Sequence, residues 1–92
     1  MLVKGTTKTG YKFELDDRIL KDWRFIQALA KSQKGTDLEK LESANDLVNL
    51  VIGQKNIEKF MSRIQKNNEG YIPIDAVMLE INGIIESIQA KN

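Results

Sequence analysis

The segment Gly10–Ala30 constrains the fold more than any other part of this chain, because an alternating strand runs directly into an amphipathic helix. One face of the expected strand carries Tyr11, Phe13 and Leu15. Asp22 can cap the helix that follows. We expect the core-facing side of that helix to carry Trp23, Ile26 and Ala30. The two apolar faces are therefore close enough along the chain to bury each other.

Residues 1–15 predict a β-hairpin. Two strand-like runs flank Lys8–Gly10, where Gly10 can supply the positive φ that a short hairpin loop needs. A hairpin alone is only marginally stable in water. We therefore expect its apolar face to pack on the helices that follow.

Residues 18–90 have the periodicity of a helical body. We expect helices over about 18–32, 37–52 and 54–66, and a last one that begins near Pro73. TDLE at residues 36–39 is typical of a capping box, although the run SAND at 43–46 offers a second start inside the same segment.

Two glycines add detail to the expected helical body. Gly53 follows an apolar helix, at the place where a left-handed cap residue belongs. Gly83 interrupts the last apolar stripe, which predicts either a close backbone approach or a bend. The expected class is α+β and mostly α, an N-terminal β-hairpin packed on about four helices. At 92 residues, we expect one domain, 1–92.

Composition narrows the classes of function. The formal net charge is +1, so no global field attracts nucleic acid, a membrane or an acidic substrate. No segment approaches the roughly 18 consecutive apolar residues of a membrane span, and the stretch MLVKGTTKTG lacks the apolar h-region that a signal peptide would need. We expect a soluble, cytoplasmic protein. Its long apolar stripes could bury within one chain or between copies, so a homo-oligomer stays open.

Catalytic chemistry has few candidates in this sequence. The chain contains neither His nor Cys, which removes the commonest general base, the strongest side-chain nucleophile and every thiolate metal ligand. Asp16, Asp17 and Asp22 lie close together, but acids at a strand end and a helix start usually cap backbone N–H groups. We expect no catalytic residues, no metal site and no cofactor.

A basic stripe supports one alternative function. Its members follow one another at helical spacing over residues 55–66: Lys55, Lys59, Arg63 and Lys66. Such a stripe could rest on nucleic-acid phosphates, as in a small DNA-binding or regulatory protein. A solvated helix face opposite the apolar stripe of the same helix explains it more simply.

Some apolar residues fall to the side of the expected core stripes. They are Phe25, Leu50 and Leu79. If these side chains cluster in the folded protein, they would form a patch for a partner helix. We therefore take them as the candidate partner-binding residues.

Five short patterns follow one another in order along the chain. GYKFELD at 10–16 ends the hairpin, and DW at 22–23 and LA at 29–30 follow in the first helix. LVNLVIG at 47–53 ends a helix in Gly, and GYIPIDAV at 70–77 opens the last one. This order resembles the small tail assembly chaperones encoded by long-tailed phages and prophages of Gram-positive bacteria.

The resemblance implies a non-enzymatic role in tail morphogenesis. Proteins of this family bind the tape measure protein, a long helical chain, and bring it together with tail tube subunits. They are absent from the mature virion. For this chain the resemblance implies protein partners in the host cytoplasm and an apolar, helical recognition surface.

Overall fold

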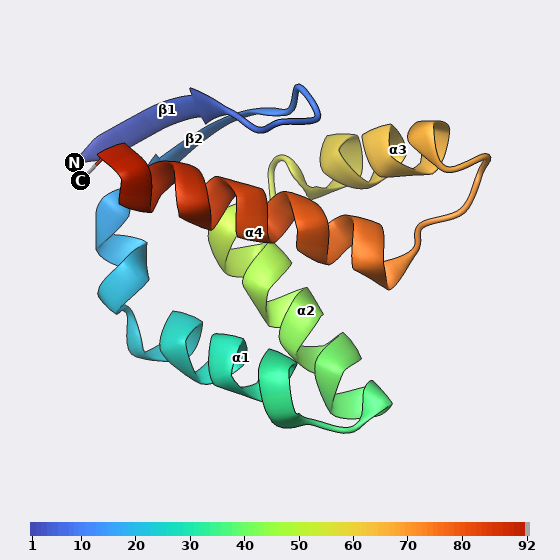
Figure 1. Ribbon diagram of the computed structural model, residues 1–92, viewed down its shortest axis with the longest axis horizontal. Coiled ribbons are helices and arrows are strands. Elements are labelled where there is room, and N and C mark those ends of the chain that lie inside the picture. The colour runs from blue at the N-terminus through green and yellow to red at the C-terminus, as the bar shows by residue number, and fades with distance from the viewer. Residues whose placement is uncertain (92) are drawn as a thin grey trace.

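The computed structural model describes residues 1–91, which form a β-hairpin, a short 3-10 helix and four α-helices (Figure 1). Their bounds are β1 (Leu2–Thr6), β2 (Lys12–Asp16), η1 (Asp17–Lys21), α1 (Trp23–Lys34), α2 (Asp37–Val51), α3 (Ile57–Asn67) and α4 (Ile74–Lys91). Helices make up 67% of the described chain. The expected class, α+β and mostly α with a hairpin on four helices, is confirmed.

The hairpin is antiparallel and closes through a tight loop. Its register pairs Val3 with Leu15 and Gly5 with Phe13. Gly10 adopts a φ of 94° and donates its N–H to the carbonyl of Thr7 at 2.9 Å. Val3 and Phe13 are buried, so the apolar face predicted for this strand is the one that packs on the helices.

Two acidic caps set the path from the hairpin into α1. The Asp16 carboxylate accepts the N–H of Arg18 at the start of η1, and the Asp22 carboxylate accepts the N–H of Arg24 at the start of α1. Each carboxylate also pairs with the guanidinium of the same arginine. These bonds hold the pKa of Asp16 well below its usual range and lower that of Asp22 to about 2.

Helices α1 and α2 follow one another through a short turn that contains the capping box of Thr36. The Thr36 hydroxyl accepts the N–H of Glu39, and the Glu39 carboxylate accepts the N–H of Thr36 in return. Helix α2 then continues without a break. Ser43 lies buried inside it and donates to the carbonyl of Lys40, so the second start offered by the sequence is not used.

Residues with positive φ form the turns on either side of α3. Gly53 has a φ of 83°, which confirms the left-handed cap after α2. Helix α3 begins at Ile57, three residues later than residue 54, where the periodicity predicts its start. Glu69 and Gly70, with φ of 57° and 91°, turn the chain after α3.

One apolar cluster joins the hairpin to all four α-helices. Side chains from the strands and the first three helices meet those of α4; among them are Val3, Phe25, Leu47 and Phe60. Within α4, the isoleucines Ile81, Ile84 and Ile88 have no exposed surface. The long stripe of α4 therefore lies buried within this chain.

The prediction of which side of α1 faces the core is wrong. Trp23 is 78% exposed and Ile26 is 53% exposed, whereas Phe25 and Ala28 are buried. The apolar residues of α1 cover an arc that is wider than one packing surface, because Phe25 and Ile26 are adjacent in sequence and point in different directions. Helix α2 packs on the Phe25–Ala28 side, and the other half of the arc faces outward.

Gly83 tests how tightly the hairpin packs on α4. A Cβ at this position would lie 3.6 Å from Cγ2 of Thr7, which is an ordinary van der Waals distance. We expect Gly83→Ala to raise the free energy of unfolding by about 1 kcal/mol, because alanine has the higher helix propensity. For a domain of this size, thermal unfolding should shift upward by about 4–8 °C. A lower melting temperature would contradict this packing.

The lowered pKa of Asp22 predicts part of the loss of stability at low pH. Its pKa falls from the ordinary 3.8 to about 2 in the folded chain, so its stabilising effect is complete above pH 4 and is lost as the pH falls toward 2. The amide of Asp22→Asn can still accept the N–H of Arg24, but it does not titrate. Melting temperatures between pH 5 and pH 2 should fall less for this variant than for the wild type. Parallel profiles would contradict the assignment.

Candidate functional site

A buried carboxylate links α4 to the hairpin loop. Glu80 lies in α4 and is only 5% exposed. Its Oε2 accepts the hydroxyl of Thr7 at 3.0 Å, and its Oε1 accepts the hydroxyl of Thr9. Because a buried charge without partners is strongly unfavourable, these bonds hold the loop against the middle of α4.

Arg63 of α3 completes this cluster. Its Nη2 donates to the carbonyl of Thr9 at 2.6 Å, and its Nη1 lies 3.8 Å from Oε1 of Glu80. The guanidinium also lies over the ring of Tyr11, 5.7 Å from the centroid. Partial burial raises the pKa of the Tyr11 hydroxyl, although the positive charge of Arg63 opposes that rise. Arg63 thus fastens α3 to the hairpin.

The structure does not assemble the basic stripe of the sequence. Lys55 lies in the turn before α3, and Lys59 and Lys66 are exposed on the helix. Arg63 is only 29% exposed and is engaged with Thr9, Glu80 and Tyr11. A continuous cationic face would need Arg63 at its centre. Because Arg63 is engaged within the fold, the support for the nucleic-acid alternative is weaker.

The outer side of α1 forms an exposed apolar surface, which we call the α1 face. It consists of Trp23, Ile26 and Ala30, spaced by three and four residues along the helix. Sequence periodicity finds these residues but assigns them to the core. Large exposed side chains on one helix face are typical of a surface that binds another protein.

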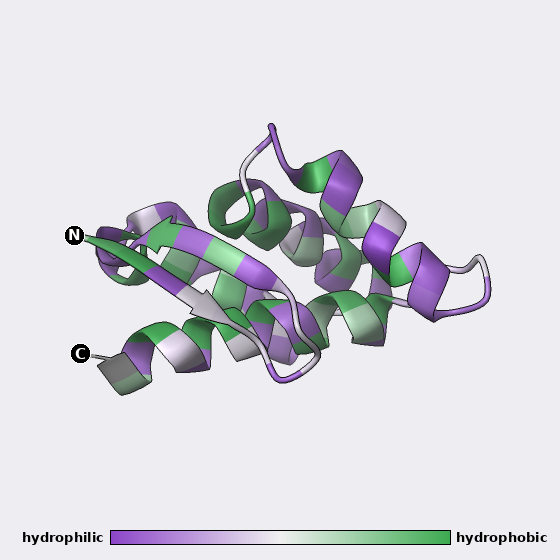
Figure 2. Ribbon diagram, turned by 90° about the horizontal axis from the view of Figure 1, so that it is seen from above, coloured by the Kyte–Doolittle hydropathy of each residue, from purple (hydrophilic) through white to green (hydrophobic). Residues whose placement is uncertain are grey.

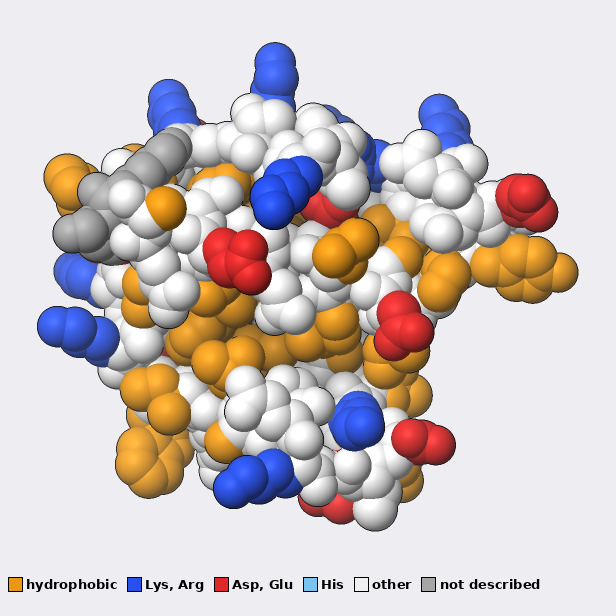
Figure 3. Space-filling model, in the orientation of Figure 1, with side chains coloured by type: hydrophobic (Ala, Val, Ile, Leu, Met, Phe, Trp, Pro, Cys, Tyr) orange, Lys and Arg blue, Asp and Glu red, His pale blue; other side chains and the backbone are white. Residues whose placement is uncertain are grey.

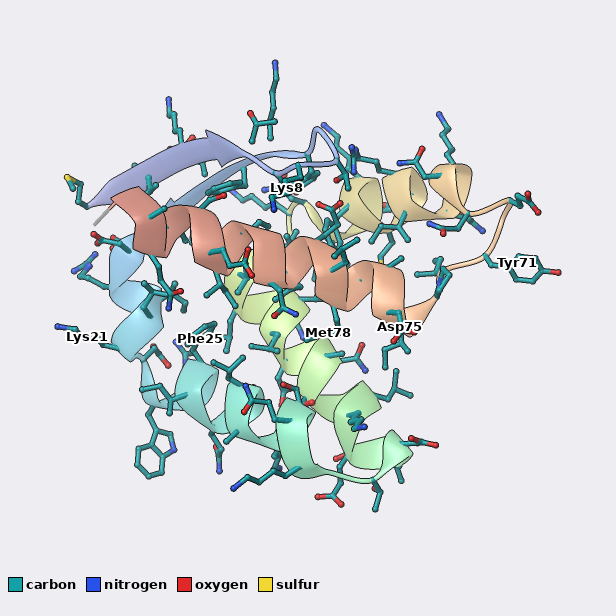
Figure 4. All side chains as sticks on the ribbon, viewed as in Figure 1. Lys8, Lys21, Phe25, Tyr71, Asp75 and Met78 are labelled. Carbon is teal, nitrogen blue, oxygen red and sulfur yellow. The ribbon has the colours of Figure 1, made fainter. Side chains whose placement is uncertain are left out.

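A hollow beside the α1 face lies between α1 and α4. It has a volume of about 300 Å³ and is bordered by Leu29 of α1 and by Ile74 and Met78 of α4. Figure 3 shows hydrophobic side chains gathered between α4 and the α1–α2 pair. Met78 points from α4 toward that pair (Figure 4). Polar residues, among them Gln33 and Asp75, also line this hollow.

The three candidate partner-binding residues do not share one exposed surface. Phe25 is only 2% exposed, so the expectation that it lies outside the core is wrong; it fills the interface between α1 and the rest of the core. Leu50 is half-buried and packs against the core, beside a small cavity between α1 and α2. Leu79 is 63% exposed on the side of α4 that faces away from the core.

Within residues 1–91, the acidic side chains form no group of three or more that could hold a metal ion. None of the helices in this range combines the length and apolar content that crossing a membrane requires.

Protein-family models, curated proteins and solved structures were compared with the chain, and none of them matches it. Any functional assignment therefore depends on the residues and surfaces of the chain itself.

Arg63 and Lys66 provide a matched pair for testing which cations are structural. We expect Arg63→Gln to lower the free energy of unfolding by about 1–2 kcal/mol, because it removes a charge-assisted bond to Thr9 and the ion pair with Glu80. Lys66→Gln should stay within about 0.5 kcal/mol of the wild type. Urea unfolding measures both. Equal effects of the two variants would contradict the structural role of Arg63.

Proposed function

We propose that this chain is a non-enzymatic, protein-binding chaperone of phage or prophage tail assembly. Its partners would be the tape measure protein and tail tube subunits in the host cytoplasm, and it would leave before the virion is complete. The resemblance of the ordered sequence patterns supports the biological role. The exposed apolar surface of α1 supports the mode of action.

The α1 face is the observation that carries the proposal. Trp23 and Ile26 keep much of their surface in contact with water, which is unfavourable unless another molecule covers them. Tryptophan is among the residues that contribute most at protein interfaces. An amphipathic helix of the partner could lie along this face, with one anchoring side chain in the hollow beside Leu29 and Met78.

This arrangement suits a chaperone that acts without chemistry. A long helical partner has apolar stripes that would otherwise associate with one another. A small domain that offers an apolar face and a polar rim can cover such a stripe reversibly, because it needs to supply only surface. The nucleic-acid alternative is weaker, since Arg63 is occupied within the fold.

The test is co-expression of this chain with the large helical protein encoded beside it, followed by co-purification at low and high salt. We expect a complex that resists salt and keeps the partner soluble. Ile26→Glu should remove the complex without changing the melting temperature, and Trp23→Ala should weaken binding by roughly 30-fold.

Leu79→Glu is the matched control, because the exposed fraction of Leu79, 63%, lies between those of Ile26 and Trp23, but Leu79 is on the outer side of α4. It should bind like the wild type. A complex that survives Ile26→Glu, or one that only Leu79→Glu removes, would contradict the α1 face. No complex, together with salt-sensitive retention of nucleic acid, would favour the regulatory alternative.

A further inference from the structure

The outer edge of β2 carries backbone groups that do not pair with β1. Thr7 donates its N–H to the carbonyl of Tyr11, and Asp17 donates its N–H to the carbonyl of Met1. These two bonds join the residue pairs that directly precede and follow the paired strands. Because hydrogen-bonded and non-hydrogen-bonded pairs alternate along an antiparallel ladder, the pairs between odd-numbered residues are the hydrogen-bonded ones. The backbone N–H and C=O groups of Lys12 and Glu14 therefore point away from β1.

This edge faces a groove. A cavity of about 660 Å³ is lined on the hairpin side by residues 4–6 of β1 and by consecutive residues of β2 from Tyr11 to Glu14. Its opposite wall is the end of α2 and the start of α3, with Ile52, Asn56 and Lys59. In Figure 2, β1 lies on the side of α4 and β2 on the side of α3. The volume falls within the range of roughly 300–1,000 Å³ that is usual for ligand pockets.

The charges along this groove are mainly positive. Lys12 lies on the strand and Lys59 on the opposite wall. Lys4 also lines the groove and stands opposite Glu14 in the hairpin register. The lining thus has a positive excess, which complements an acidic ligand.

We propose that the outer edge of β2 binds an extended, acidic peptide segment of a partner protein as a third strand. This function goes beyond the proposed docking of a helix on α1 and uses a different part of the molecule. The peptide backbone would pair with the outward groups of Lys12 and Glu14, and its acidic side chains would lie between Lys12 and Lys59. Main-chain bonds supply the affinity in this mode, and side chains supply the selectivity.

An extended peptide fits this site better than a second copy of the chain. The wall formed by Ile52 and Asn56 stands across the groove from the edge of β2. A second copy that paired through its own β2 would also bring the end of its α2 and the start of its α3 toward this groove, where they would collide with the first copy. A charged edge strand also opposes unspecific pairing of this kind.

The test uses an eight-residue acidic peptide in which glutamate alternates with valine, and a basic peptide in which lysine replaces glutamate. Amide hydrogen exchange of the intact chain is followed by NMR with and without each peptide. The amides of Lys12 and Glu14 should exchange at least roughly tenfold more slowly with the acidic peptide, because strand addition pairs them. The basic peptide should have no effect.

A matched pair of variants separates strand pairing from charge. Glu14→Pro removes an outward N–H without removing a bond to β1, whereas Glu14→Thr keeps that N–H and removes the same charge. The proline variant should lose peptide binding, and the threonine variant should retain it. Lys59→Glu, on the opposite wall, should weaken binding by roughly tenfold and leaves the hairpin untouched.

Several results would overturn the proposal. One is the absence of acidic-peptide binding at millimolar concentration, and another is binding that leaves the exchange of Lys12 and Glu14 unchanged. Preference for a single-stranded oligonucleotide would assign the groove to nucleic acid. Protection of the two amides at high protein concentration without peptide, together with a dimer in sedimentation, would assign the edge to a second copy.

Discussion

The buried carboxylate of Glu80 is the constraint on which the arrangement of this molecule depends. A charge in the middle of α4 is stable there only because the hairpin loop supplies the hydroxyls of Thr7 and Thr9 and α3 supplies Arg63. These bonds join three segments that lie far apart in the sequence. They hold β1 beside α4 and leave the outer edge of β2 turned toward the end of α2 and the start of α3.

The same packing leaves α1 partly uncovered. Helix α4 supplies the centre of the core with Ile81, Ile84 and Ile88, and α1 contributes only Phe25 and Ala28 to the buried set. Trp23 and Ile26 remain outside because no described element reaches that side of the helix. The molecule thus offers an apolar face on α1 and, between β2 and α3, a groove whose lining has a positive excess. Both surfaces suit binding without chemistry.

Local signals in the sequence predicted much of the fold. The alternation at Tyr11–Leu15, the caps at Asp22 and Thr36 and the left-handed Gly53 depend on neighbouring residues, and each is confirmed. The candidate surface was harder to predict, because α1 has a wide apolar arc and only tertiary packing decides which half is buried. Sequence periodicity therefore predicts Trp23 in the core and Phe25 outside it, whereas the structure has Phe25 buried and Trp23 exposed. The role of Arg63 also depends on distant partners, Thr9 and Glu80, that helical spacing does not reveal.

The fluorescence of Trp23 tests the central claim, that the α1 face is the docking surface, most directly. It is the chain's only tryptophan, so its emission reports on this face alone. In the free chain we expect emission typical of a solvated indole, which acrylamide quenches efficiently. In the complex with the co-purified helical partner, the emission should move to shorter wavelengths and the quenching should fall. A tryptophan already shielded in the free monomer, or one equally accessible in the complex, would contradict the account.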